Sequence, residues 1–286
     1  MRIRLLTIVI GALTAGQGRL AAQTYLPADS ACIVRLLGSA AHESRTTCFP
    51  LFFARSFLGR PYVAHTLESA NGDEQLVVNT RQLDCTTLVE NVTALTLCAY
   101  RNLYTYHDFL NALMQLRYRR GRLNGYASRL HYFSDWIDDN TAMELVDEVQ
   151  APTPPFTAVQ TLDVNYMSSH TGTYSALRKQ PSLVGLIRQQ EKALTGRTYR
   201  YIPKAEVADT QALHKAVADG DIVAITCNKR GLDIAHVGIA VWHQDGLHLL
   251  NASQLHKKVV EESMTLSDYL SHHPSHTGLR IIRIKK

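Results

Sequence analysis

The clearest structural signal in the chain is a strand–turn–strand pattern, which runs His236-Val-Gly-Ile-Ala-Val-Trp-His-Gln-Asp-Gly-Leu-His-Leu-Leu-Asn-Ala-Ser253. Apolar residues alternate with small or polar ones around Asp245-Gly246, a dipeptide typical of tight hairpin turns. The alternation places His236 and Val237 on opposite faces of the first strand. If the turn has an even number of residues, Asn251 shares the face of His236, and an odd number would move it to the other face.

Further strand-like runs lie in the last third of the chain, at residues 221–226, 258–261 and 280–284. The earlier part shows the helical spacing of apolar residues. Helices are expected over residues 29–58, 85–100, 107–118 and 183–194. Helices followed by antiparallel strands predict an α+β fold, not a doubly wound parallel sheet. The proline-rich stretch 151–155 predicts an extended connection, but neither flank shows a core of its own, so residues 23–286 are expected to form a single domain.

The first 22 residues have the organisation of a secretory signal peptide. Met1-Arg-Ile-Arg4 is positively charged, Leu5–Leu13 is mostly apolar, and small residues lead to Leu20-Ala-Ala-Gln23. The apolar run is shorter than the roughly 20 residues that span a bilayer. We therefore expect residues 1–22 to be removed and the mature protein to be exported to the periplasm, without stable membrane insertion.

The composition is that of an ordinary globular protein, with 45% hydrophobic and 19% charged residues, which argues against disorder and against a coiled coil. The formal charge of +5 includes Arg2, Arg4 and Arg19 of the leader, and the rest of the chain has 27 basic and 25 acidic residues. A nearly neutral protein without a long Lys/Arg run is not expected to bind nucleic acid. We expect a monomer that needs no cofactor and no metal.

The chain has five cysteines, so in an oxidising compartment at least one thiol stays free. Cys32 and Cys48 could form a disulfide, and the sequence leaves this open. Cys98 and Cys227 lie in apolar contexts that are typical of inert core residues.

Cys85 has a different setting, because it follows Asp84 and opens the expected helix 85–100. Aspartate is a good N-cap, which places Cys85 in the first helical turn. The free backbone N–H groups and the helix dipole there favour the nucleophilic thiolate. The alternative is a thiol that merely packs at a helix start.

A nucleophilic thiol needs a base, and His236 is the best placed of the 13 histidines. Its strand face also carries Gly238 and Ala240, small residues that leave room for a substrate or the end of a helix. For an isolated histidine the alternative is a hydrogen-bonded core residue. With an even turn, the amide of Asn251 could hold the imidazole in the productive tautomer, as the third member of a triad.

Five motifs resemble, in this order, those of NlpC-type papain-like peptidoglycan hydrolases: Gly59-Arg-Pro-Tyr62, Asp84-Cys-Thr-Thr-Leu-Val89, Gly220-Asp-Ile-Val-Ala-Ile225, His236-Val-Gly-Ile-Ala-Val241 and Leu249-Leu-Asn-Ala-Ser253. Thr66–Glu68, Leu130–Trp136 and Met167–His170 resemble the N-acetylmuramoyl-L-alanine amidase-like branch. The motifs together run from about residue 50 to the C-terminus. The resemblance implies a papain-like fold, in which N-terminal helices, one of them bearing the cysteine, pack on a C-terminal antiparallel sheet or half-barrel.

The resemblance also assigns roles. Cys85 would be the nucleophile, His236 the general base and Asn251 the residue that orients the ring. Tyr62 matches a tyrosine beside the nucleophile, whose hydroxyl could help bind the oxyanion. Residues around 101–205 exceed a minimal core and would form an insert that shapes the substrate cleft. The candidate substrate contacts are Asp84, Thr86, His131, Ser134, Trp136 and Ser253, with a core position as the alternative for Trp136.

The implied activity is that of an exported cysteine amidase. It would cut the amide between the muramoyl lactyl group and L-Ala in peptidoglycan fragments (muropeptides), and a preference for 1,6-anhydro forms is expected. One alternative is an endopeptidase that cuts between D-Glu and the diamino acid of the stem peptide. Another is a catalytically inactive module that binds the cell wall.

Other motifs are weaker. Thr46 stands where a zinc-protease helix beginning at His42-Glu43 needs its second histidine. The histidine-rich stretch 271–276 could bind a metal but is expected to be a solvated loop. Asp135, Asp138 and Asp139 could suggest a glycosidase, yet a solvated acidic face is the simpler interpretation.

Overall fold

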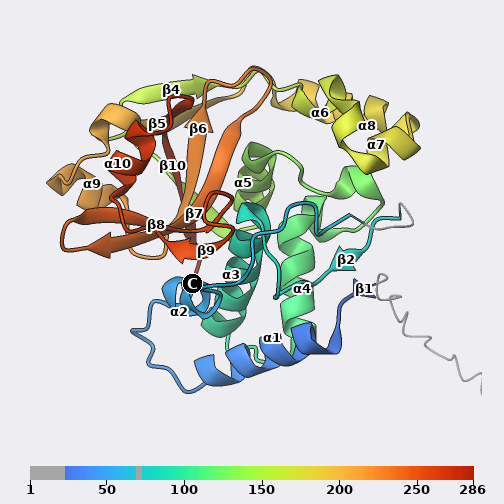
Figure 1. Cartoon of the computed structure of the whole chain (residues 1–286), viewed down its shortest axis with the longest axis horizontal. Coiled ribbons are helices and arrows are strands. Elements are labelled where there is room, and N and C mark those ends of the chain that lie inside the picture. The colour runs from blue at the N-terminus through green and yellow to red at the C-terminus, as the bar shows by residue number, and fades with distance from the viewer. Residues whose placement is uncertain (1–22, 69–72) are drawn as a thin grey trace, which may run out of the picture.

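A computed structural model describes residues 23–68 and 73–286 (Figure 1). The expected signal peptide, residues 1–22, lies outside the described residues. The α-helices are α1 (Pro27–Ala40), α2 (Phe49–Ser56), α3 (Cys85–Tyr100), α4 (Tyr106–Arg117), α5 (Phe133–Ala142), α6 (Tyr166–Ser169), α7 (Ser175–Lys179), α8 (Ser182–Leu194), α9 (Gln211–Ala216) and α10 (Leu266–Ser271). The strands are β1 (Gln23–Thr24), β2 (Leu76–Val77), β3 (Val146–Val149), β4 (Ala158–Thr161), β5 (Thr198–Pro203), β6 (Ile222–Cys227), β7 (Ile234–His243), β8 (Gly246–Ser253), β9 (Lys258–Glu261) and β10 (His276–Ile284).

The strands form one large antiparallel sheet in the order β4-β5-β10-β6-β7-β8-β9. Strand β10 has β6 along one edge, while β5 and β3 pair with successive parts of its other edge. A separate short parallel pair joins β1 to β2. The mixed α+β organisation with an antiparallel sheet, expected from the sequence, is confirmed.

The two faces of the sheet pack against different helices (Figure 1). Val237 and Ile239 of β7 belong to the larger apolar core, which also contains residues of α1 to α4. Ala240 and Leu249 face the other way, into a second core with residues of α9 and α10. The period-two alternation of β7 therefore places the face of His236 opposite the face that covers the N-terminal helices.

The long stretch before β6 is divided between the main fold and a peripheral unit. Helices α4 and α5 contribute Leu113 and Trp136 to the larger core, while β3 and β5 extend the sheet along β10. Helices α6 to α8 instead surround a third apolar cluster that includes Met167, Leu177 and Ile187. The peripheral unit lies beside the sheet, at the upper right of Figure 1.

Several helix bounds agree closely with the sequence-based expectations, but the region 29–58 is two helices rather than one. The chain leaves the helical path between α1 and α2, where the hydroxyl of Ser44 accepts a hydrogen bond from the Thr46 N–H at 3.2 Å. Pro50 then lies in the first turn of α2, a position that tolerates proline, whereas a helix interior does not. Strands β3 to β5 were not expected. No helix in the described ranges has the length and apolar character required to cross a bilayer.

Candidate active site

Cys85 is the first residue of α3, and the preceding residue caps the helix. The carboxylate of Asp84 accepts a hydrogen bond from the Thr87 N–H at 2.8 Å. In return, the Asp84 N–H donates to the Thr87 hydroxyl at 2.9 Å. This capping box fixes the path of the chain through the first turn. The expectation that Asp84 is the N-cap is confirmed.

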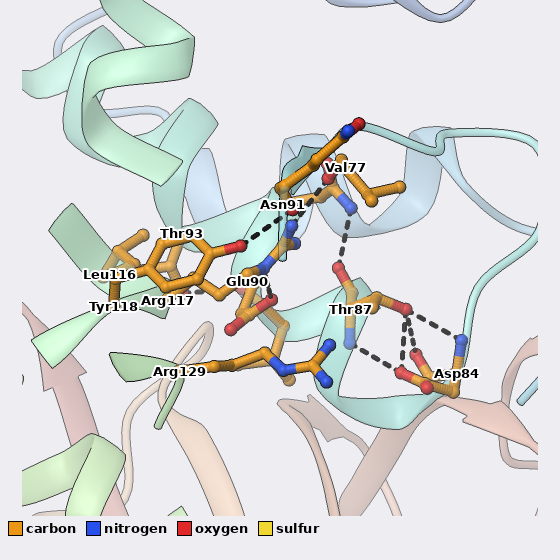
Figure 2. A network of polar contacts seen from close by, with 12 residues as sticks. Val77, Asp84, Thr87, Glu90, Asn91, Thr93, Leu116, Arg117, Tyr118 and Arg129 are labelled. Carbon is orange, nitrogen blue, oxygen red and sulfur yellow. Dashed lines mark hydrogen bonds and ion pairs between the residues drawn. The ribbon is translucent and has the colours of Figure 1, made fainter. Parts of the chain in front are cut away.

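Buried polar contacts hold α3 to α4 and to the chain around β2 (Figure 2). Arg117 Nε donates to Glu90 Oε2 at 2.7 Å, and Arg117 Nη1 donates to the Val77 carbonyl at 2.6 Å. Both charged side chains are almost inaccessible to solvent. A second ion pair joins Arg129 to Glu74 at 3.4 Å. Glu90 of the helix that carries Cys85 is thus tied directly to α4, and through Arg117 to β2.

His236 and Asn251 meet across the β7–β8 hairpin. His243 pairs with Gly246, so the turn has two residues and Asn251 lies on the same face as His236. The Nε2 atom of His236 lies 3.0 Å from Oδ1 of Asn251. Gly238 lies on the same face, where its small size was expected to leave room for a substrate or the end of a helix. A Cβ there would lie 2.7 Å from Leu249 Cδ1, so its space is filled by the neighbouring strand and not by a substrate.

Cys85 and His236 line the same cavity, of about 140 Å³. Thr86 and His131 also contribute to its wall. Aromatic side chains complete the lining: Tyr132, Phe133, Tyr166 and Tyr174. A larger cavity of about 570 Å³ lies beside Cys48 but has no histidine in its lining. The shared cavity is therefore where a thiol and an imidazole can act on one substrate.

The electrostatics of the pair differ from the sequence-based expectation of a thiolate. Burial raises the pKa of Cys85 to about 11, and the charge of Asp84 adds to the rise, against hydrogen bonds from the Val237 backbone and Thr86. Burial also lowers the pKa of His236. Desolvation disfavours the charged form of both groups and outweighs the helix N-terminus. At neutral pH the pair therefore rests as a thiol and a neutral imidazole.

Tyr62 lies near the nucleophile. Its backbone forms an isolated parallel bridge with Leu83, two residues before Cys85. Burial raises the pKa of Tyr62 to about 12, and the charges of Cys85 and Asp84 contribute to the rise. The phenol therefore stays protonated at neutral pH and can donate a hydrogen bond.

The structure separates the candidate substrate contacts into two groups. Thr86 and His131 line the cavity beside Cys85, and burial lowers the pKa of His131 to about 3, so it is neutral. Ser134 and Trp136 do not line the cavity, and both are fully buried. The Ser134 hydroxyl accepts a hydrogen bond from Arg280 at 2.7 Å. The Trp136 ring stacks on Phe133, with centroids 4.9 Å apart, in the core position that was its alternative.

The other two candidates have local roles at the ends of elements. Asp84 caps α3, as described above. Ser253, at the end of β8, is buried, and its hydroxyl accepts a hydrogen bond from the His256 N–H at 3.2 Å. Neither residue is part of the cavity lining.

No helix was expected over residues 133–142, so the side chains that form the aromatic wall were not identified from the sequence. That helix begins at Phe133, and no side-chain hydrogen bond caps it, so its first residue was not marked in the sequence. Tyr132 and Phe133 therefore reach the cavity, while Ser134 and Trp136 turn into the core. The motif segments around residues 130 and 167 were the available signal, since both supply lining residues.

The acidic residues of α5 do not form a glycosidase pair. Arg119 binds Asp135, with one contact at 3.0 Å, and Arg197 binds Asp138 at 2.7 Å. The remaining aspartate of the group, Asp139, accepts a hydrogen bond from a backbone N–H. They were expected to form a solvated acidic face, and the structure shows a set of paired carboxylates instead.

Among the described residues, one group has metal-ligating side chains close together: His243, Asp245 and His248, with ligand atoms within 4.8 Å of one another. All three are engaged in hydrogen bonds. The nitrogens of His248 lie 2.9 Å from Asp245 and 2.8 Å from the Glu262 carbonyl, and His243 lies 2.6 Å from Glu261. Alternation along β7 puts His243 on the face opposite His236.

The histidine-rich stretch 271–276 is only partly the solvated loop expected. His276 is buried at the start of β10, and its ring stacks on His273 with centroids 4.7 Å apart. All five cysteines lie in the described ranges and are free thiols, so Cys32 and Cys48 are not bridged.

Comparisons with known proteins identify the family of the chain. The family model described as AmiA-like, N-acetylmuramoyl-L-alanine amidase-like, matches residues 52–279. A crystal structure of an N-acetylmuramoyl-L-alanine amidase from Bacteroides uniformis is 40% identical with a TM-score of 0.78, and the match covers 83% of this chain and 98% of that one. A Bacteroides fragilis protein provisionally named a xylanase is 39% identical with a TM-score of 0.76, over 82% of this chain and 100% of that one.

A Legionella pneumophila protein shares the fold at 21% identity, with a TM-score of 0.67 over 90% of this chain and 94% of that one. No curated protein is significantly similar to the chain. The family match runs from α2 into β10 and includes Cys85, His236 and Asn251. The chain therefore belongs to the AmiA-like, N-acetylmuramoyl-L-alanine amidase-like family.

Proposed function

We propose that this protein is a cysteine amidase that hydrolyses the amide between N-acetylmuramoyl and L-Ala in peptidoglycan fragments. The observation that carries the proposal is the cavity shared by Cys85, at a capped helix start, and His236, held by Asn251. Family membership supplies the amidase class and peptidoglycan as the substrate. The NlpC-type papain-like resemblance of the motifs supports a thiol nucleophile.

The chemistry is acyl transfer from nitrogen to sulfur and then to water. As the Cys85 sulfur attacks the lactyl carbonyl carbon, its proton passes to His236. His236 then protonates the amine of L-Ala as the C–N bond breaks, which leaves a thioester on Cys85. Water attacks this thioester with His236 as the base, and the released thiol recovers its proton.

The tetrahedral intermediate carries an oxyanion that needs hydrogen-bond donors. The backbone N–H of Cys85 is free at the helix start, because the first four N–H groups of a helix have no partner within it. The Tyr62 hydroxyl is the second candidate donor, since the charge of Cys85 acts on it and it keeps its proton. Two aimed donors in a buried site are the usual arrangement for such an oxyanion.

Mass spectrometry of defined muropeptides tests the proposal. Anhydro and reduced muropeptides are incubated with the protein, with Cys85→Ala and with a matched control, Cys227→Ala, whose thiol lies outside the cavity. Free sugar plus an intact stem peptide, lost only in Cys85→Ala, is expected. A sugar that still carries L-Ala-D-Glu would assign endopeptidase activity instead. No cleavage of either muropeptide would favour an inactive cell-wall binding module.

The rates on the two muropeptides also test the proposed preference for 1,6-anhydro forms. Export to the periplasm is a separate proposal, which rests on the pattern of residues 1–22. N-terminal sequencing of the mature protein is expected to find a start near Gln23, and an intact Met1 in the exported fraction would contradict cleavage.

A further inference from the structure

The hydrogen-bond chain behind His236 continues past Asn251. The Asn251 Nδ2 group donates to Glu262 Oε1 at 2.9 Å. The other carboxylate oxygen, Oε2, lies 3.1 Å from Nε2 of His256. Only 1% of Asn251 and 4% of Glu262 is exposed, whereas the His256 side chain is half-exposed. The chain therefore runs from the cavity to the surface through a buried carboxylate.

This arrangement dictates the proton positions. A carboxylate only accepts hydrogen bonds, so the NH₂ group of Asn251 must face Glu262. Its Oδ1 then faces His236 and accepts only if Nε2 of that ring carries a proton. A neutral imidazole with Nε2–H has a bare Nδ1, which is the nitrogen left to accept the Cys85 proton.

The opposite orientation of the Asn251 amide would favour the other tautomer of His236. With Oδ1 toward Glu262, two acceptors would face each other, and Nδ2 would donate to a bare Nε2 of His236. The neutral ring would then carry its proton on Nδ1 and could not accept one there. Asn251 alone can adopt either orientation, because its amide is both donor and acceptor. The buried carboxylate breaks that symmetry.

We propose that Glu262 is a positioning residue that selects the base-competent tautomer of His236 through Asn251. The inference rests on the proposed function, because it assigns a role within the Cys85–His236 chemistry. Nothing in the family match or in the sequence motifs assigns this residue. It follows β9 and shares the face of Val260, which pairs with Asn251.

Other charged or titratable groups also act on His236. The charges of Glu262 and Asp84 raise the pKa of His236, and His273 lowers it, as burial does most strongly. His276 faces the same region, because His236 and His273 both lower its pKa. Around Glu262 itself lie His256 and, from α10, Tyr269, whose pKa the Glu262 charge raises.

The test is the tautomer of His236, measured from the ¹⁵N chemical shifts of its ring. Glu262→Gln keeps the shape but offers both a donor and an acceptor, so both Asn251 orientations become possible. Glu261→Gln is the matched control, since its side chain points to the other face and pairs with Arg55 at 3.1 Å. His236→Gln identifies the signal among the 13 histidines.

The proposal predicts Nε2–H in the wild type and in Glu261→Gln, and a mixture of tautomers in Glu262→Gln. Predominant Nδ1–H in the wild type, or an unchanged Nε2–H ring in a folded Glu262→Gln, would overturn it. Predominant Nδ1–H in the wild type would overturn the proposal even if the variant does not fold. Since it needs no turnover, its failure is distinguishable from failure of the proposed function.

Kinetics provide a second readout. Glu262→Gln is expected to lower kcat about 10- to 100-fold, the range of one charged hydrogen bond, with KM little changed. The acidic limb of the pH–rate profile of Glu262→Gln should move to lower pH, because the variant lacks the charge that raises the pKa of His236. Glu261→Gln should show neither effect. A loss of activity without a shift of the limb would indicate a merely structural role and contradict the proposal.

Discussion

Replacing Arg117 with methionine is expected to destabilise the protein by about 3–5 kcal/mol, the usual cost of leaving one member of a buried ion pair without its partner. The side chains of Arg117 and Glu90 are 2% and 3% exposed, and Nε lies 2.7 Å from Oε2. A pair of charges about 4 Å apart at an effective dielectric constant of about 20 gives about 4 kcal/mol, in the same range. The variant also leaves the Val77 carbonyl without its donor.

The dependence on pH distinguishes a lost ion pair from a simple cavity. Burial raises the pKa of Glu90 and Arg117 lowers it, so removal of Arg117 raises the pKa further. A carboxyl with a raised folded-state pKa loses stability as pH rises above its unfolded value of 4.5. The deficit of Arg117→Met should therefore grow as the pH rises above 4.5. A cavity would give a deficit that does not vary with pH.

Urea unfolding, followed by far-UV circular dichroism, measures both effects. Arg197→Met is the matched control, because its ion pair with Asp138 is 48% and 26% exposed and is expected to contribute under about 1 kcal/mol. The double variant Arg117→Met, Glu90→Leu should recover most of the loss, since no charge is left buried alone. A deficit in Arg117→Met no larger than that in Arg197→Met would show that the buried ion pair contributes no more than an exposed one.

Three further predictions concern the cavity. Asp84→Asn keeps an N-cap but removes a charge that raises the pKa of Cys85. Iodoacetamide should therefore alkylate Cys85 faster in this variant at about pH 8, as followed by peptide mass spectrometry. An equal or slower rate would contradict this prediction. The rising limb of kcat/KM should lie below pH 6.5, because burial lowers the pKa of His236 from that value, and a limb above pH 6.5 in the pH profile would be inconsistent with it. If the Tyr62 hydroxyl binds the oxyanion, Tyr62→Phe should lower kcat about 10²-fold and leave Tm unchanged. Full activity of this variant in steady-state kinetics would show that the hydroxyl does not have that role.

The parts of the site that follow from local sequence were predictable. The turn signal Asp245-Gly246 predicted the hairpin and left an even or an odd turn open, and the two-residue turn of the structure places Asn251 beside His236. Asp84 marked the start of α3, because its cap is formed within one turn. Both features depend on neighbours close in the sequence.

Features that depend on the assembled fold could not be predicted. The state of Cys85 is set by burial, which the sequence does not show and which outweighs the helix N-terminus. Helix α5 has no capping side chain, so the phase that turns Trp136 into the core was hidden. Glu262 was not singled out from the sequence, because only the β8–β9 register places it beside Asn251.

Intact-protein mass spectrometry of an acid-quenched reaction with a muropeptide detects the proposed thioester itself. A transient adduct on Cys85 with the mass of the muramoyl acyl group and no amino acid is expected, absent from Cys85→Ala. An adduct that includes L-Ala-D-Glu, or one on another residue, would contradict this expectation.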